Sequence, residues 1–547
     1  MAAGLGDGDG PLNDPRWLRL TPILPAAFLI SFLVVPTAMI VRYALWDTGR
    51  SESALNQSAL AVITSWSTWQ IVLLAIGQAL VSTAAALLVG VPLANVVTRY
   101  RFRGRAFAQA LLTVPFVLPT VIVALAFRQF LGGSTGLVLV IIAHAYVNLA
   151  VVVRIVGSQW AQLDPRAPSI ARTLGAGPWT AFRTVTLPML RGALASSAAV
   201  VFAFCFTSLG IVLILGDANA RTLEGQILRR TSLLLDFPGA AALALLQLAI
   251  VGTALFLGTR ARVHGQRLQP RPLLALPGRA LPRAAILGTA ALGVAVVLLP
   301  ILALVRASLA GAGGWTLAWW TSLGSIDAGT TRIGSPLSAL QVSAWYALLT
   351  GLVAGLIGGC AALAVLRARI GRAITVIALA PLGISAATIG LGTLLAYGRP
   401  PFDLRGTGLL VPLAHALVAI PLVVAVAAPS LRAADPRLAR VAATLGARPS
   451  RAFATAYGPI LLVVMVAAAG LAAAVSLGEF GAASFLAREG SPTVPVQIVR
   501  LLSRPGEQSI GAASAMAVIL TVATLALVLA VDALGKRTGA GRWGLRT

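Results

Sequence analysis

Acidic residues and lysine are scarce in this chain of 547 residues. Only 11% of the residues are charged, 16 residues are acidic, and Lys536 is the single lysine. An ordinary soluble globular domain carries roughly 25% charged residues. With 58% hydrophobic residues and a mean hydropathy of +0.90, the chain has more apolar surface than a soluble core could bury. This composition indicates a polytopic membrane protein.

Cysteine and histidine are also sparse. The two cysteines, Cys205 and Cys360, lie in apolar runs and exclude a disulfide framework or a cysteine-type zinc site. Three histidines with few carboxylates in the apolar runs argue against a metal centre or a membrane-embedded enzyme. The phosphate-binding sequence Gly-x-x-x-x-Gly-Lys-Ser/Thr, which marks many ATP-binding proteins, is absent from the chain. We therefore expect no catalytic residue, no metal and no cofactor on this chain.

Apolar runs long enough to cross a membrane recur along the whole chain. There are about twelve, six in each half, and they predict an all-α protein. The runs cover residues 22–44, 69–98, 107–131, 136–157, 190–215, 237–258, 284–308, 336–366, 373–397, 407–428, 460–482 and 511–534. Pro115, Pro119 and Pro381 fall within the third and ninth runs and are candidate kinks.

A polar, arginine-bearing segment interrupts this pattern twice. The first copy runs from Leu163 to Leu190 and the second from Ala434 to Leu461, and Asp164 in the first matches Asp435 in the second, 271 positions later. At the same offset Pro165, Thr173, Leu174, Gly175, Ala176, Pro178, Ala181, Phe182 and Pro188 recur as Pro436, Thr444, Leu445, Gly446, Ala447, Pro449, Ala452, Phe453 and Pro459. A repeat of about half the chain length indicates a duplication in which this segment keeps one role in both halves.

Each copy has the start and stop signals of two short helices. An aspartate followed by a proline suits the start of the first helix, and Gly175 or Gly446 suits its C-terminal cap. Pro178 opens the second helix, which we expect to end at Pro188 before the next spanning run. Such a helix–glycine–helix bracket between two spans is a stiff lever that a cytoplasmic partner can push.

The distribution of positive charge predicts the orientation. The net charge is +26, and the arginines gather in alternate loops, which include both repeated segments, the linker and the C-terminal tail. The opposite loops carry most of the acids, among them Glu224, and many tryptophans. By the positive-inside rule both termini, the linker and both repeated segments lie in the cytoplasm. Arginines spread over short loops, rather than gathered in one patch, argue against binding to nucleic acid.

The repeated segment resembles the coupling-helix signature of ABC importer permeases, in which Glu-Ala-Ala, three residues, Gly and nine residues precede Ile-x-Leu-Pro. Gly175 with Val185-Thr186-Leu187-Pro188 fits this signature, and Ala456-Tyr457-Gly458-Pro459 is a weaker second copy. The glutamate is missing from both copies, where Ser169-Ile170-Ala171 and Arg440-Val441-Ala442 stand instead. The resemblance covers nearly the whole chain and implies two fused permease units of the type I importer class.

The chain accordingly divides into five segments. They are a cytoplasmic tail at 1–21, a permease unit at 22–258 with a coupling loop at 158–189, a linker at 259–283, a second unit at 284–534 with a coupling loop at 429–460, and a tail at 535–547. The residues that the resemblance implies for contact with the ATPase are Ser169, Ala171, Gly175, Ala176, Pro188, Arg440, Ala442, Gly446, Ala447 and Pro459. The implied partners are two copies of an ATP-binding subunit, an extracytoplasmic solute-binding protein and the lipid of a bacterial plasma membrane.

Shorter matches resemble one branch of this family. Phe204-Cys205-Phe206-Thr207-Ser208-Leu209 and Ser476-Leu477-Gly478-Glu479-Phe480-Gly481 are similar to the fused thiamine permeases and their ferric-iron relatives. This likeness implies import of thiamine or ferric iron, with sulfate, molybdate or a polyamine as further options. An ion-coupled carrier with no ATPase partner, also built from two halves, is the alternative.

Four polar residues within the apolar runs are candidates for the transport path: His144, His415, Glu479 and Ser208. The two histidines are also 271 positions apart, and they either line the path or form hydrogen bonds between helices. Aligning Gly210 with Gly478 places Glu479 opposite Ile211, so one half carries a charge that the other lacks. Glu479 either contacts a cationic substrate such as thiamine or lies solvated at the membrane interface.

Overall fold

The structure is a computed structural model that describes residues 20–46, 59–164, 166–217, 221–260, 272–324, 335–364, 370–398, 400, 402–432 and 435–537. Apart from isolated bridges, the strands in these residues form one hairpin, made of β1 (Ala310–Gly311) and β2 (Gly314–Trp315). Nearly all the rest is helical, which confirms the all-α prediction. Pro165, most of the predicted N-terminal tail and parts of the linker and C-terminal tail lie outside the described residues.

Ten helical stretches of the described chain are long and apolar enough to cross a membrane. In the first half they are Ile23–Trp46, α4 (Trp66–Arg99), α7 (Leu137–Trp160), Pro178–Phe206 and α13 (Phe237–Arg260). In the second half they are α14 (Ala280–Ala307), α16 (Pro336–Ala364), α19 (Leu410–Arg432), α21 (Pro449–Gly478) and α24 (Glu507–Arg537). Two bent helix pairs raise the number of candidate spans to as many as twelve, in agreement with the prediction.

The third and ninth predicted spans are each broken in the middle. α5 (Arg105–Val117) and α6 (Thr120–Phe130) meet at 106°. The end of α17 (Ile370–Leu379) continues as η5 (Ala380–Gly383), and this stretch meets α18 (Ala386–Tyr397) at 104°. Pro119 disfavours a helical conformation at the preceding residue, and Leu118 is extended with a ψ of 136°. Both runs are therefore broken, but of the three candidate prolines only Pro119 lies at a break, whereas Pro115 lies inside α5 and Pro381 inside η5.

Shorter helices make up the connections and complete the spans. Ile23–Trp46 consists of α1 (Ile23–Leu29), the π-helical η2 (Ile30–Val34) and α2 (Val35–Trp46), while Pro178–Phe206 consists of α9 (Pro178–Ala181), the π-helical η3 (Phe182–Thr186) and α10 (Leu187–Phe206). The others are α3 (Ala59–Thr64), α8 (Arg166–Thr173), α11 (Leu209–Leu215), α12 (Leu223–Ser232), α15 (Ala318–Thr321), η4 (Ser322–Gly324), η6 (Arg405–Thr407), α20 (Pro436–Thr444), α22 (Gly481–Leu486) and α23 (Val494–Leu502).

Each half packs its first spanning helix against the other half. The α1–η2–α2 helix packs against α16, α17, α18 and α19, and α14 packs against α4, α5 and α6. Tyr397 in α18 donates a hydrogen bond to the carbonyl of Ser31 at 2.6 Å. Tyr146 in α7 likewise donates to the carbonyl of Val297 in α14 at 3.1 Å. This exchange interlocks the two halves.

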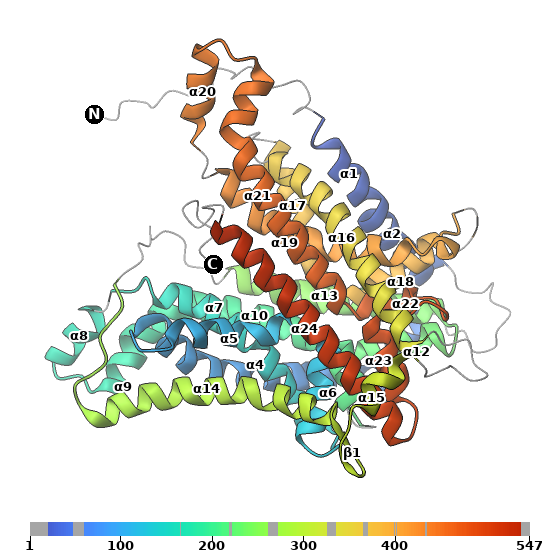
Figure 1. Ribbon diagram of the computed structural model, residues 1–547, viewed down its shortest axis with the longest axis horizontal. Coiled ribbons are helices and arrows are strands. Elements are labelled where there is room, and N and C mark those ends of the chain that lie inside the picture. The colour runs from blue at the N-terminus through green and yellow to red at the C-terminus, as the bar shows by residue number, and fades with distance from the viewer. Residues whose placement is uncertain are drawn as a thin grey trace.

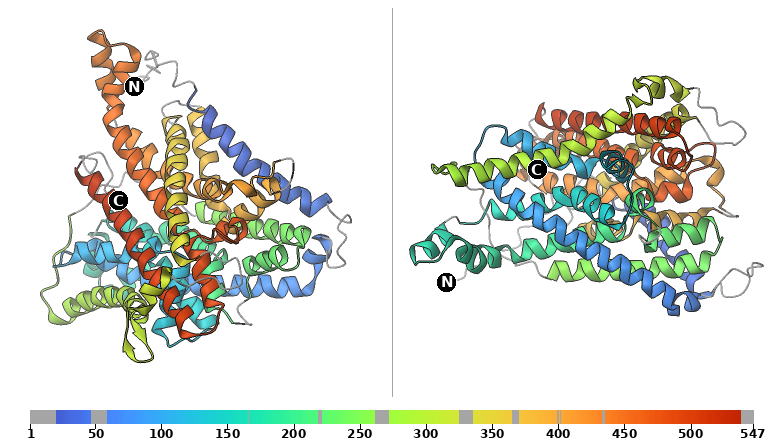
Figure 2. Two further views of the ribbon diagram at one scale, coloured as in Figure 1. Left: turned by 45° about the vertical axis from the view of Figure 1, so that its right-hand side comes forward. Right: turned by 90° about the horizontal axis from the view of Figure 1, so that it is seen from below.

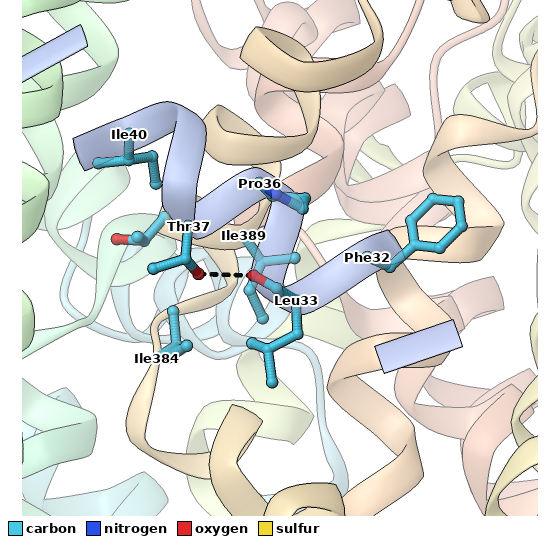
Figure 3. Close-up of a pocket in the computed structure, with 8 residues that line it drawn as sticks. Phe32, Leu33, Pro36, Thr37, Ile40, Ile384 and Ile389 are labelled. Carbon is cyan, nitrogen blue, oxygen red and sulfur yellow. Dashed lines mark hydrogen bonds between the residues drawn. The ribbon is translucent and has the colours of Figure 1, made fainter. Parts of the chain in front are cut away.

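The contact between the exchanged first helix and α18 leaves little space. Figure 3 shows the apolar side chains around a void of about 10 Å³, which include Phe32, Leu33, Pro36, Ile40, Ile384 and Ile389. Gly392 faces the same helix, and a Cβ atom there would lie 3.0 Å from both Pro36 Cβ and Ile40 Cδ1. A glycine at this position therefore permits the close approach of α18.

The two halves form arms that diverge from one region (Figures 1 and 2). In Figure 1 the first arm, with α4, α7, α10 and α14, runs to the left, and the second arm, with α16, α19 and α21, runs to the top. α8 lies at the far end of the first arm and α20 at the far end of the second. The arms meet where α12, α18, α22 and α23 lie, a region that we call the apex.

The described end of the linker is attached to the first half. Leu274 forms a parallel bridge with Tyr100. The N–H of Leu274 donates to the carbonyl of Arg99 at 2.7 Å, and the N–H of Arg101 donates to the carbonyl of Leu274 at 2.9 Å. These bonds fix where the chain enters α14.

We expect Gly392→Val to lower the free energy of unfolding by about 1–3 kcal/mol, because its side chain would push α18 away from the exchanged helix. The measurement is thermal unfolding of the purified protein in detergent. Gly252→Val is the matched control, since a Cβ atom on Gly252 meets nothing within 4 Å. Equal melting temperatures for the two variants would contradict the close contact.

Candidate functional site

The first repeated segment forms the predicted helix–glycine–helix bracket. Asp164 Oδ1 accepts a hydrogen bond from the N–H of Arg166 at 2.9 Å, at the start of α8. Gly175 has a φ of +89°, and the N–H of Ala176 donates to the carbonyl of Ala171 at 3.0 Å. This arrangement closes the helix C-terminus around a left-handed glycine.

The second repeated segment has the same local geometry. Asp435 Oδ1 accepts the N–H of Arg437 at 2.9 Å. Gly446 has a φ of +82°, and the N–H of Ala447 donates to the carbonyl of Ala442 at 3.0 Å. The two brackets therefore repeat hydrogen bond for hydrogen bond.

The second helix of each bracket continues into a span, so the prediction that it ends at Pro188 is wrong. α9 passes through η3 into α10 without interruption. In η3 the N–H of Leu187 reaches back five residues to the carbonyl of Phe182, and Pro188 follows in the first turn of α10, where a missing N–H is tolerated. Pro459 lies inside the continuous helix α21. Each bracket is thus one end of a membrane helix.

Apolar side chains protrude from both brackets at matching positions. Leu174 and Leu445 are 82% and 83% exposed, and Ile170 and Val441, one turn earlier, are also exposed. Exposed apolar residues gathered on a short polar segment are typical of a protein contact site. The repeat of the same pair in both brackets indicates two equivalent contact sites.

The predicted coupling residues lie on these brackets in matched environments. Exposed residues are Ser169, Gly175, Pro188, Arg440, Gly446 and Pro459, and half-buried residues are Ala171, Ala176, Ala442 and Ala447. The brackets differ in their anchoring. In the first, Phe182 stacks between Trp179 and Trp160 at centroid distances of 5.6 and 6.2 Å, whereas in the second Phe453 stacks on Tyr457 at 4.9 Å.

His144 is buried between two helices of the first half. Its Nδ1 atom is hydrogen-bonded to the amide nitrogen of Gln78 in α4 at 2.6 Å. That amide nitrogen also donates to Ser82 Oγ at 3.0 Å. The interaction joins α4 to α7, as expected for a histidine that holds two helices together.

Four helix breaks meet at the apex: those between α5 and α6, η5 and α18, α10 and α11, and α21 and α22. A Cβ atom on Gly210 would lie 2.7 Å from Thr120 Oγ1 and 3.5 Å from Phe480 Cδ1 of the other half. A Cβ atom on Gly478 would lie 2.9 Å from Pro119 Cγ, again across the halves. The breaks of the two halves are therefore in direct contact.

Glu479 lies in the break between α21 and α22 and is buried rather than solvated. Its Oε2 atom is 3.0 Å from His415 Nε2 and accepts the N–H groups of Ala482 and Ala483 at 3.0 and 3.2 Å. His415 Nδ1 in turn is 2.9 Å from Ser476 Oγ. The carboxylate thus ties α19 to both sides of the break.

Ser208, and not Ile211, is the structural counterpart of Glu479. Ser208 lies in the two-residue break between α10 and α11, and the offset of 271 that aligns the brackets also aligns it with Glu479. The alignment of Gly210 with Gly478 is therefore wrong. Ser208 is buried, and among the described residues its Oγ has no hydrogen-bond partner.

Glu224 is a site residue that the sequence pattern did not reveal, because it falls in a polar stretch between two spans. It is 1% exposed and lies in the first turn of α12. Its Oε1 accepts the amide of Gln247 at 2.8 Å, and it is hydrogen-bonded to Ser385 of the second half. Burial raises the pKa of Glu224 to about 8 despite these two bonds, and the charge of Glu479 contributes to the rise.

A cavity of about 280 Å³ lies between the halves beside the apex. Its lining comes from α12 and the start of α13 on one side and from α18, η6 and α22 on the other, and comprises Thr231, Ser232, Leu235, Phe237, Leu394, Leu395, Gly398, Arg405 and Phe485. Glu224 and Ser385 lie at the N-terminal ends of α12 and α18, whose C-terminal ends line this cavity. Within the described residues no group of three His, Cys, Asp or Glu side chains could hold a metal ion.

Comparison with known proteins identifies a family model that matches residues 86–265, described as the inner membrane component of binding-protein-dependent transport systems. The chain is 30% identical over 192 residues to the molybdate/tungstate permease WtpB of Thermococcus kodakarensis, covering 34% of this chain and 73% of that protein. It is 29% identical over 216 residues to the putative 2-aminoethylphosphonate permease PhnV of Salmonella paratyphi A, covering 37% and 79%. It is 26% identical over 495 residues to the thiamine permease ThiP of Brucella abortus, covering 85% and 87%.

We expect Gln78→Leu to destabilise the protein by about 1–3 kcal/mol, because it leaves the buried His144 without its partner. The double variant Gln78→Leu/His144→Leu should recover most of this loss, since both polar groups are then replaced by apolar ones. Thermal unfolding measures the stability, and solute uptake measures function. A double variant with wild-type stability but no uptake would place His144 on the transport path instead.

Proposed function

Because the chain belongs to the family of inner membrane components of binding-protein-dependent transport systems, we propose that it is the subunit through which thiamine enters the cell. It is a multi-pass membrane protein and the permease component of an ABC importer, not a catalytic enzyme. ATP-binding and solute-binding subunits are the partners of such a component. The match to a thiamine permease over 85% of this chain carries the substrate proposal, because the other two relatives cover only 34% and 37% of it.

Both brackets, both termini and the linker lie on the cytoplasmic side in this proposal. The arginines that gather in these segments support this orientation by the positive-inside rule. The brackets then face the ATP-binding subunits, and the connections at the apex face the solute-binding protein.

Each bracket docks on one copy of the ATP-binding subunit, so the complex holds two copies. Leu174 and Leu445 insert into an apolar groove of that subunit, an idea supported by their high exposure and matched positions. Ser169 and Arg440 occupy positions where the family signature has glutamate, so the polar part of this contact differs between the two brackets.

The brackets transmit the motion of the ATP-binding subunits to the apex. α21 is one helix from the second bracket to Glu479, and α9–η3–α10 is continuous from the first bracket to the break that holds Ser208. Closing the two arms on ATP binding would separate the contacts at the apex and open the path outward. ATP hydrolysis would then reset the arms.

The substrate passes between the halves at the apex, where Glu479, His415 and Ser208 line the path. Thiamine carries a positive charge, which suits a site with a buried carboxylate. Ferric iron is the second candidate, and molybdate or a phosphonate would be a poorer match to an acidic path. The chain itself works without a cofactor or a resident metal in this proposal.

We expect Gly175→Asp to lower uptake by at least about fivefold, because a side chain at positive φ costs roughly 1–2 kcal/mol and distorts the bracket. Gly446→Asp should act in the same way. The measurement is uptake at equal membrane expression, with copurification of the ATP-binding subunit as a second readout. Gly177→Asp is the matched control, since Gly177 has a φ of −63° and an equally open environment. Wild-type uptake by Gly175→Asp and Gly446→Asp would contradict the coupling role.

Deletion of the chain should abolish high-affinity uptake of labelled thiamine and leave labelled ferric iron uptake unchanged. The two uptakes are measured side by side in cells with and without the chain. The substrate concentration is about 1 μM, at the low end of usual KM values, so that a high-affinity route dominates. Loss of iron uptake alone would reverse the substrate proposal and leave the permease assignment intact.

A further inference from the structure

Two buried carboxylates approach each other from different halves. Glu224 lies in the first turn of α12 in the first half, and Glu479 lies in the α21–α22 break of the second half. A Cβ atom on Gly481 would lie 3.1 Å from Glu479 Oε1 and 2.9 Å from the N atom of Ala387, so Glu479 lies at the start of α18. Ser385, which precedes α18, is the hydrogen-bond partner of Glu224 in the second half, so both carboxylates lie at the same helix end. The duplication does not account for this pair, because Pro495 lies 271 positions after Glu224 and Ser208 lies 271 positions before Glu479.

Among the described residues no arginine or lysine forms an ion pair with either carboxylate. His415 lies beside Glu479 only, with its Nε2 atom 3.0 Å from Glu479 Oε2, and leaves Glu224 without a cationic partner in the described chain. Arg230 on α12 is already paired with Asp236. Two buried carboxylates near each other cannot both remain ionised at low cost without a compensating charge. The pair therefore needs a bound proton or a bound cation.

The charged groups on the elements around Glu224 do not supply this compensation. They are Arg221 just before α12, Arg229 and Arg230 on α12, Asp236 before α13, Glu479 before α22, and Arg99 and Arg260 at the far ends of α4 and α13. Of these, Glu479 is the one whose charge raises the pKa of Glu224. In the absence of a substrate, a proton on Glu224 is the simplest way to keep the pair at low charge, in agreement with its raised pKa.

Within the described part of the chain, Gln247 places an oxygen atom that has no hydrogen-bond donor beside Glu224. Gln247 donates its amide nitrogen to Glu224, while its buried Oε1 atom has no hydrogen-bond partner among the described residues. Glu479 Oε2 already accepts two backbone N–H groups and Glu224 Oε1 accepts the Gln247 amide, so few oxygens remain for a hard multivalent ion, which takes six or more oxygen ligands. They suit a single positive charge spread over an organic ring, which needs electrostatic compensation and not a full coordination shell.

We propose that Glu224 and Glu479, with Gln247 Oε1, form a binding site for an organic monocation in transit between the halves. This inference rests on the proposed function and names Glu224 as a second specificity-determining residue. When the cation enters, the proton on Glu224 leaves to the outer solvent, so one positive charge replaces another and the net charge of the site is unchanged. A substrate of the same shape without the charge gains nothing from this exchange.

The test compares a charged and an uncharged ligand in cells in which each variant replaces the wild-type gene. Labelled thiamine uptake is inhibited with unlabelled thiamine or with its neutral analogue, in which a carbon atom replaces the charged ring nitrogen. In the wild type we expect thiamine to compete at least about tenfold better than the analogue. The analogue lacks the charge-assisted contact to the carboxylates, and the loss of one such contact lowers affinity by about this factor. In Glu224→Gln the KM for thiamine should rise about tenfold, and the preference for the charged ligand should largely disappear.

Two further variants separate a role in binding from a role in stability. Glu224→Asp keeps the charge and should recover part of the preference for thiamine over the neutral analogue. Glu489→Gln removes an exposed carboxylate from the same end of the second half and should leave both the KM and the preference unchanged. Membrane levels of all variants are compared by immunoblot, and a purely structural role for Glu224 would lower those levels without changing the preference.

The pH dependence gives an independent readout. Because the cation displaces a proton, thiamine affinity should rise from pH 6 to pH 8, by at most about tenfold per pH unit, and the rise should be smaller in Glu224→Gln. If wild-type cells do not import thiamine, the proposed substrate and this inference both fall. If the wild type imports thiamine but Glu224→Gln keeps the same preference and pH profile, this inference alone is overturned.

Discussion

The burial of broken backbone at the apex is the constraint on which the rest of the structure depends. No water is available within a membrane to bond with exposed N–H and C=O groups, so broken helices persist only where protein surrounds them. Glu479 accepts the N–H groups of Ala482 and Ala483, and Ser385 accepts the N–H of Thr388. The other breaks shield the remaining backbone groups from lipid, because Gly210 and Gly478 let the backbones of the two halves come into contact at this point. The halves cannot separate at the apex without a new partner for these groups, whereas the distant ends of the arms carry no such restriction.

The duplication is closely preserved at the brackets and lost at the apex. Both brackets have the same cap, the same left-handed glycine and the same exposed leucine. At the apex, however, Glu479 stands opposite Ser208, and Glu224 stands opposite Pro495. On the proposed function, two similar partners push two similar brackets, but a single small solute meets both halves at once. The proposed path between the halves therefore does not require equal residues on its two sides, and each half contributes one carboxylate at a different position.

The sequence was sufficient to predict features that depend on neighbouring residues. The lengths of apolar runs located the spans, and Asp164, Gly175 and their repeats located the helix ends of the brackets, because caps and turns are set by local backbone geometry. The exchange of the first helices was not predictable, since it depends on packing between segments hundreds of residues apart. Glu224 was missed for the same reason: its burial is produced by α13 and α18, and nothing next to it in the chain indicates this. The end expected at Pro188 was wrong because a π-helical turn precedes the proline and keeps the helix continuous.

The two continuous helices that lead from the brackets to the apex are not mechanically equal. α21 has 30 residues, a length of about 45 Å at 1.5 Å per residue, and no π-helical turn interrupts it. The corresponding helix of the first half contains η3 directly after its bracket, and such a π-helical turn locally replaces the α-helical hydrogen-bond pattern. The aromatic stack of Trp179, Phe182 and Trp160 lies at this turn and supports it from the side. On the proposed mechanism, the second bracket drives Glu479 through an α-helix in which Pro459 removes one backbone hydrogen bond. The first bracket drives Ser208 through a helix whose π-helical turn depends on side-chain packing for its stiffness. The two links from the brackets to the apex are therefore each weakened near the bracket, one by a proline and the other by a π-helical turn.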